Sequence, residues 1–71
     1  MNKYHVWIPE DYELPSVVDM VTYLCEMSIE FDAAYRPNRE GTMFTFFADS
    51  LPTLWGQYLY ADNLVTEVWA K

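Results

Sequence analysis

Residues 29–49, with the sequence IEFDAAYRPNREGTMFTFFAD, contain the pattern that decides the fold. From position 29 to position 35 every second residue is apolar, which is the period of a strand with one face against a core. Pro37, Asn38 and Gly41 supply turn chemistry, because proline fixes φ whereas asparagine and glycine accept positive φ. Residues 42–48 are rich in threonine and phenylalanine, which favour strands. We therefore expect a β-hairpin.

The segment before the hairpin predicts a strand followed by a helix. Residues 4–8 favour a strand, and Pro9 ends it because proline lacks the donor that a strand ladder needs. Ser16 is a candidate N-cap, and Asp19 completes a capping box for a helix that ends near Met27. The predicted buried stripe of this helix consists of Val17, Met20, Val21, Leu24 and Cys25.

The segment after the hairpin predicts a second helix and a final strand. Ser50 is the candidate cap, and Pro52 is tolerated in the first helical turn. The apolar positions of this helix follow the helical period: Leu51, Leu54, Trp55, Tyr58 and Leu59. Residues 64–70 then form the last strand. An alternative reads the second helix as another strand, which would give an α+β meander with a single helix.

The predicted order β-α-β-β-α-β matches a ferredoxin-like α+β fold and makes residues 1–71 one small domain. Right-handed crossovers place two helices on one face of a four-stranded antiparallel sheet, with the first and third strands central. The residues predicted to face the core are Tyr4, Val6, Ile8, Ile29, Phe31, Ala33, Tyr35, Phe44, Phe46 and Val68. The residues predicted to face away are His5, Trp7, Glu30, Asp32, Thr45, Phe47, Glu67 and Trp69. The fold itself names no activity.

The chain is acidic, with eleven Asp and Glu against four Lys and Arg and a formal net charge of −7. This disfavours direct binding of nucleic acid, because phosphate contacts require cations. The candidate partner-binding acids lie in the first half of the chain: Glu10, Asp11, Glu13, Glu26 and Asp19, with Glu30 and Asp32 on the hairpin. Such carboxylates can imitate nucleic-acid phosphates and bind a basic protein surface, or they can simply be solvated.

A second candidate surface is the open side of the sheet, where Trp7, Phe47 and Trp69 are expected. A homodimer or another protein partner could cover these aromatic side chains, or they could pack on one another and stay partly wet. Stacking of RNA bases is disfavoured because three carboxylates and no Lys or Arg are predicted on this face.

No motif predicts catalysis, a metal or a cofactor. His5 and Cys25 are the only histidine and cysteine, so a zinc set is absent, and Cys25 is expected to be a small buried hydrophobe. The sequence contains neither a calcium loop nor a glycine-rich phosphate loop. We expect a non-enzymatic protein. The lone cysteine and the lack of a signal peptide or membrane span predict a cytoplasmic location.

In size, acidity, aromatic content and lack of catalytic motifs, the chain resembles the small phage-encoded inhibitors of bacterial defence, including anti-CRISPR proteins. The resemblance is one of general type and carries over no functional residue. It implies that the protein blocks a basic nucleic-acid channel of an effector complex in the host cytoplasm, where Asp11, Glu13, Asp19 and Glu26 would be the leading contacts. The alternative function is a small oligomeric regulatory or ligand-binding domain that pairs through its open sheet face.

Overall fold

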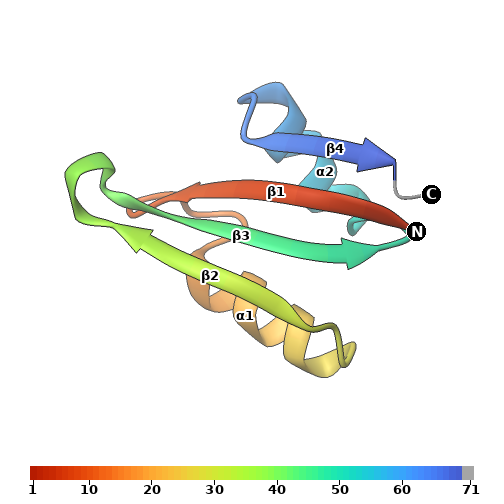
Figure 1. Ribbon diagram of the computed structural model, residues 1–71. Coiled ribbons are helices and arrows are strands. Elements are labelled where there is room, and N and C mark those ends of the chain that lie inside the picture. The colour runs from red at the N-terminus through yellow and green to blue at the C-terminus, as the bar shows by residue number, and fades with distance from the viewer. Residues whose placement is uncertain (70–71) are drawn as a thin grey trace.

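The structure, a computed structural model, describes residues 1–69, and it describes Trp69 by its backbone alone. The elements are β1 (Asn2–Pro9), α1 (Val17–Glu26), β2 (Phe31–Arg36), the 3-10 turn η1 (Pro37–Arg39), β3 (Gly41–Ala48), α2 (Thr53–Ala61) and β4 (Val65–Trp69). The strands form one antiparallel sheet in the order β2-β3-β1-β4 (Figure 1). The predicted ferredoxin-like topology is confirmed, and the meander alternative is wrong because residues 53–61 are helical.

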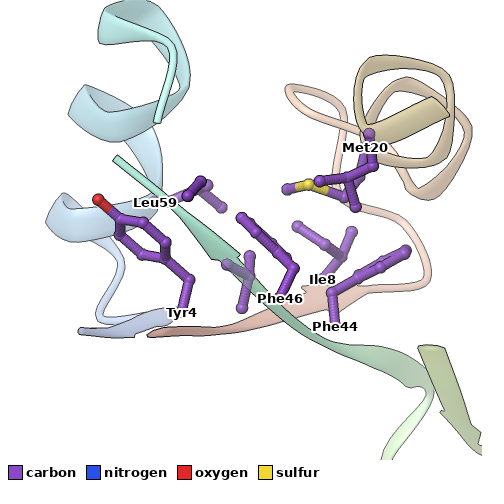
Figure 2. Packing of buried hydrophobic residues seen from close by; sticks show 9 residues of the cluster. Tyr4, Ile8, Met20, Phe44, Phe46 and Leu59 are labelled. Carbon is purple, nitrogen blue, oxygen red and sulfur yellow. The ribbon is translucent and has the colours of Figure 1, made fainter. Parts of the chain in front are cut away.

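The hydrophobic core lies between the sheet and the two helices. Figure 2 shows Met20 of α1 and Leu59 of α2 on the same side of the sheet as Phe44 and Phe46. Both helices therefore cover one face. The buried apolar residues are Tyr4, Val6, Ile8, Met20, Leu24, Phe44, Phe46, Ala48 and Leu59. Neither helix in residues 1–69 is long and apolar enough to cross a membrane.

Both helices end in the same way. Ser28 and Asn63 follow the helices with φ values of 56° and 58°. The N–H groups of Ile29 and Leu64 then donate back to the carbonyls of Leu24 and Leu59, each at 2.9 Å. This is the Schellman arrangement, which satisfies carbonyls that a helix end leaves open. It also turns Ile29 and Leu64 toward the core, where both pack as half-buried residues.

The first helix begins as predicted, whereas the second does not. At α1, the Ser16 hydroxyl accepts from the Asp19 N–H at 3.2 Å, and the Asp19 carboxylate accepts from the Ser16 N–H at 3.0 Å. At α2, the N-cap position is Pro52, and no side chain caps the helix. The predicted cap at Ser50 is therefore wrong.

The alternation of β4 is opposite to the prediction. The register pairs Val65 with Val6 and Glu67 with Tyr4, so positions 65 and 67 lie on the helix side. Val68 pairs with Lys3 and is 45% exposed on the open side. Residues 64–70 have apolar side chains in both phases, so alternation could not choose between them. The predicted orientations of Glu67 and Val68 are wrong, and Ala70 lies outside the described residues.

Several residues predicted to be buried are exposed. Tyr35 lies near the β2–β3 turn, away from the core cluster that Phe31 joins, and is 54% exposed. Cys25 is also exposed at the edge of α1. On α2, which lies over the β1–β4 side of the sheet (Figure 1), only a narrow stripe packs inward. The exposed predicted-core residues are Ala33, Tyr35, Cys25, Leu54 and Tyr58.

The hairpin turn uses its glycine for space rather than for positive φ. The residue with positive φ is Glu40, in the left-handed conformation with φ of 52°, and not Asn38 or Gly41 as predicted. A Cβ at Gly41 would overlap the Trp7 indole and lie 2.8 Å from the backbone carbonyl oxygen of Ile8. The missing side chain at Gly41 therefore lets Trp7 lie across the start of β3.

Candidate functional site

Five exposed carboxylates from three segments meet at the end of the sheet where β1 stops and β3 begins. We call them the acid end: Glu10, Asp11 and Glu13 after β1, Glu40 before β3, and Asp62 after α2. Two hydrogen bonds hold these segments together. The Glu10 N–H donates to the Glu40 carbonyl at 2.7 Å, and the Tyr12 hydroxyl donates to the Asp62 carboxylate at 2.6 Å.

An open groove of about 560 Å³ lies at the acid end. Its walls combine carboxylates with the rings of two tyrosines, and its lining residues are Pro9, Asp11, Tyr12, Glu13, Leu14, Tyr58 and Asp62. Carboxylates attract a cation through its charge, and aromatic rings attract it through their negative faces. The groove is therefore suited to a cationic side chain of a partner.

Tyr12 is the hydrogen-bond donor of this groove. Burial and the hydrogen bond to the Asp62 carboxylate raise the pKa of Tyr12 to about 12. The phenol therefore stays neutral at physiological pH and keeps its proton for donation. The same hydroxyl lies 3.2 Å from the carbonyl oxygen of Tyr58, so Tyr12 contacts α2 twice.

Within residues 1–69, no Lys or Arg forms an ion pair with the acid end, although Arg36 and Arg39 lie in the same turn as Glu40. The ion pair found in this part of the chain joins the N-terminal ammonium to Asp49 at 3.9 Å. Two bases lie instead against aromatic rings: the Arg39 guanidinium is 5.6 Å from the Trp7 ring centre, and Lys3 Nζ is 5.9 Å from that of Phe47. The five carboxylates of the acid end are thus available to an external cation.

The structure places the seven candidate partner-binding acids on different parts of the surface. Glu10, Asp11 and Glu13 lie at the acid end, whereas Glu26 and Glu30 lie at the opposite end, where α1 stops and β2 begins. A ten-residue helix such as α1 spans about 15 Å. Asp32 faces the open side, opposite Thr45.

The structure adds two features to the acidic surface expected from the sequence. The carboxylate of Asp19 is half-buried and bound to Ser16 at the start of α1, so Asp19 serves the helix cap. Glu40 and Asp62 were not among the candidates, because each stands alone in its turn in the sequence. Only the hydrogen bonds at Glu10 and Tyr12 show that these turns meet.

The open face contains the predicted His5, Trp7, Asp32, Thr45 and Phe47, and also Lys3 and Val68. Trp7 is half-buried between Gly41 and Arg39, which leaves Phe47, 47% exposed, as the accessible aromatic side chain among the described residues of this face. Trp69 pairs with Asn2 through its backbone, and its side chain lies outside the described part of the chain. The prediction that this face has no base is wrong because Lys3 lies on it.

Phe47 separates two hollows at the end of the sheet opposite the acid end. One, of about 270 Å³, is lined by Lys3, Glu30, Phe31, Asp32, Thr45, Phe46 and Phe47. The other, of about 350 Å³, is lined by Met1, Tyr23, Met27, Ile29, Phe47, Ala48, Asp49 and Ser50. The Phe47 ring is therefore an apolar contact surface with acidic residues on both sides.

Within residues 1–69, no group of three or more His, Cys, Asp or Glu side chains could hold a metal ion. His5 Nδ1 lies 3.2 Å from Thr45 Oγ1 across the β1–β3 pair, and no carboxylate in the described chain hydrogen-bonds to this imidazole. Cys25 lies apart from His5, on α1. Comparisons with models of protein families, with curated proteins and with solved structures found no match.

Proposed function

We propose that this chain is a non-enzymatic binding protein that attaches through its acid end to a basic surface of a partner protein. The observation that carries the proposal is the meeting of three segments that bear five exposed carboxylates. These carboxylates outnumber the two arginines of the same end, Arg36 and Arg39, and form no ion pair with Lys or Arg in the described chain. Close like charges repel one another, and a basic partner would relieve that repulsion. The same field would accelerate the encounter with such a partner.

The groove supports a specific contact within this surface. A Lys or Arg side chain of the partner would enter between Asp11, Glu13 and Asp62 while lying against Tyr12 and Tyr58. Desolvated cationic and aromatic contacts are enriched among the residues that dominate binding energy. The hydrogen bonds from Glu10 to Glu40 and from Tyr12 to Asp62 order the groove before binding, which lowers the entropic cost.

We further propose that the protein acts as an inhibitor. Through its acid end the protein would compete with nucleic acid for the basic channel of a host defence complex, as the resemblance to anti-CRISPR proteins implies. Support comes from the net charge of −7 and from the fixed placement of the acid-end carboxylates on structured turns. Carboxylates that imitate nucleic-acid phosphates require Lys and Arg side chains on the partner, and surfaces that bind nucleic acid carry them.

The proposal is tested with two variants that each remove three negative charges. Glu10→Gln/Asp11→Asn/Glu13→Gln changes the acid end, and Glu26→Gln/Glu30→Gln/Asp32→Asn changes the remote acids. An arginine-rich peptide serves as the probe, and its affinity is measured by calorimetry over a range of salt concentrations. We expect the first variant to weaken binding about tenfold and the second less than about twofold. Equal weakening would show that only total charge matters.

The inhibitory form has a separate test. Purified CRISPR effector complexes carrying labelled target DNA are mixed with the protein, and release of the DNA is followed by fluorescence anisotropy. We expect the wild-type chain and the remote-acid variant to release the DNA, and the acid-end variant to fail. If the wild-type chain releases no DNA while the peptide experiment succeeds, the acid end binds a different class of basic partner.

A further inference from the structure

Three rows of residues on the open face have complementary side chains on the two sides of β3. The register aligns His5, Thr45 and Asp32 in one row and Trp7, Met43 and Ala34 in the next. Lys3 and Phe47 form a third row, which reaches Glu30 when the register continues by one residue. In these three rows the β1 residue is basic or large, whereas the residue on the β2 side is acidic or small. The fourth row, Pro9, Gly41 and Arg36, has the opposite arrangement, with a base on β2.

The charges of these rows are not paired within one chain. β1 and β2 lie on opposite sides of β3, about 10 Å apart at two strand spacings. Lys3 and Glu30 line the same hollow of about 270 Å³, yet Lys3 forms no ion pair within residues 1–69. The hollow thus holds a base on one side, acids on the other and the exposed Phe47 ring between them.

We propose that a second copy of this chain docks on the open face about a twofold axis that runs along β3. This rotation places β1 of each copy over β2 of the other. Lys3 then meets Glu30 of the second copy, His5 meets Asp32, and Trp7 lies over the small Ala34. Phe47 lies at the axis against its own counterpart. Lys3 and Glu30 would thus gain an ion pair, and Asp32 would gain the His5 imidazole as a hydrogen-bond partner, each twice per dimer.

The overlap between the two copies corresponds to a small interface. An axis along β3 superposes β2, β3 and β1 of the two copies and leaves β4 outside the overlap. Three strands spaced about 4.8 Å apart, with up to eight residues rising about 3.3 Å each, cover about 380 Å² in projection. Protruding side chains raise the accessible area above this projection, toward the value of about 600 Å² per partner at which stable interfaces begin. The dimer would cover Phe47, which is 47% exposed.

This inference does not rest on the proposed function, because it uses the open face rather than the acid end. The dimer would nevertheless affect the acid end. Rotation about an axis along the strands leaves the strand direction the same in both copies, so the two acid ends lie at the same end of the dimer. A basic partner would then meet both.

The test is an exchange of charges followed by sedimentation equilibrium at concentrations up to about 1 mM. We expect the wild-type chain to dimerise. Lys3→Glu and Glu30→Lys each place like charges opposite one another twice per dimer, so each should weaken the dimer at least about tenfold. The double variant Lys3→Glu/Glu30→Lys restores opposite charges and should recover the dimer. Glu13→Lys, an identical change at the acid end, is the control and should leave the dimer intact.

Three results would overturn the inference: a wild-type chain that remains monomeric, single variants that behave like Glu13→Lys, or a double variant that fails to recover. Circular dichroism on every variant ensures that only folded chains are compared. A second, independent variant, Phe47→Asp, should also dissociate the dimer, because it puts two carboxylates face to face at the axis. A dimer that survives Phe47→Asp would place the interface elsewhere.

Discussion

The hydroxyl of Tyr12 donates a 2.6 Å hydrogen bond to the carboxylate of Asp62, and this bond joins the loop after β1 to the end of α2. The two residues are 50 positions apart in the chain. Their contact brings Asp62, from the C-terminal part of the chain, beside Asp11 and Glu13 and forms one wall of the groove at the acid end. The candidate binding surface therefore depends on a tertiary contact.

Replacing Tyr12 by Phe should loosen this contact. We expect a loss of about 0.5–1 kcal/mol in the free energy of unfolding, which is below the usual range for a hydrogen bond to a charged group because the site is partly exposed. Amide exchange in residues 10–14 should also accelerate. Urea unfolding and hydrogen exchange measure the two effects. Tyr58→Phe is the matched control, because the Tyr12 hydroxyl contacts only the backbone carbonyl of Tyr58. Equal effects of the two variants would contradict the role of the bond.

Stability should fall at alkaline pH through two tyrosines. Burial and the hydrogen bond to Asp62 raise the pKa of Tyr12 to about 12, and burial and the hydrogen bond to Glu67 do the same for Tyr60. Because Tyr60 is 46% exposed, we weigh its hydrogen bond above burial. Between about pH 10 and 12 the unfolded chain loses these protons while the folded chain keeps them, so unfolding becomes easier as pH rises.

The check is the urea midpoint as a function of pH. The variant Tyr12→Phe/Tyr60→Phe lacks both phenols, so its midpoint should fall less steeply between pH 10 and 12 than that of the wild-type chain. Parallel curves for the two chains would show that other groups cause the alkaline loss.

The two glycines should respond to alanine in opposite directions. At Gly41, a new Cβ would overlap the Trp7 indole and press on the Ile8 carbonyl, so Gly41→Ala should cost about 1–3 kcal/mol. At Gly56, within α2, the nearest atoms are those of the Tyr60 ring at 3.7 Å, an ordinary contact. Gly56→Ala should therefore stabilise by about 0.5–1 kcal/mol. Thermal unfolding tests the pair, and the same sign for both variants would refute the account of Gly41.

Asp19 should matter for stability and not for binding. Its carboxylate completes the capping box with Ser16, so Asp19→Ala should cost about 0.5–1 kcal/mol. Ser16→Ala breaks the same box without removing a charge and should cost a similar amount. Affinity for the arginine-rich peptide should be equal in the two variants. Weaker binding by Asp19→Ala alone would return Asp19 to the binding surface.

The strand order and the phase of β1 and β3 could be predicted from the sequence, because most large apolar residues there occupy one phase, with Trp7 and Phe47 in the other. Tyr4, Val6, Ile8, Phe44 and Phe46 are all buried, as predicted. In β4 the pattern was ambiguous, and pairing with β1 sets the phase instead. Glu67 can lie on the helix side because Asn2 and Tyr60 donate hydrogen bonds to it, and both donors come from other elements.

The acid end was predictable only in part for a related reason. The run from Glu10 to Glu13 is dense enough to be noticed in the sequence, whereas Glu40 and Asp62 are single acids in turns. Their place beside the first group depends on the register at Gly41 and on the bond from Tyr12. The other candidate acids Glu26 and Glu30 lie at the opposite end of the sheet, because α1 carries the chain there.

The most direct test of the acid end is a titration of the isotope-labelled chain with the arginine-rich peptide, followed by amide chemical shifts in NMR spectra. We expect the largest shifts at residues 10–14, at Glu40 and at Asp62, with little change at Glu26 and Glu30. Shifts centred on Lys3 and Phe47, or spread evenly over all acidic residues, would contradict this expectation.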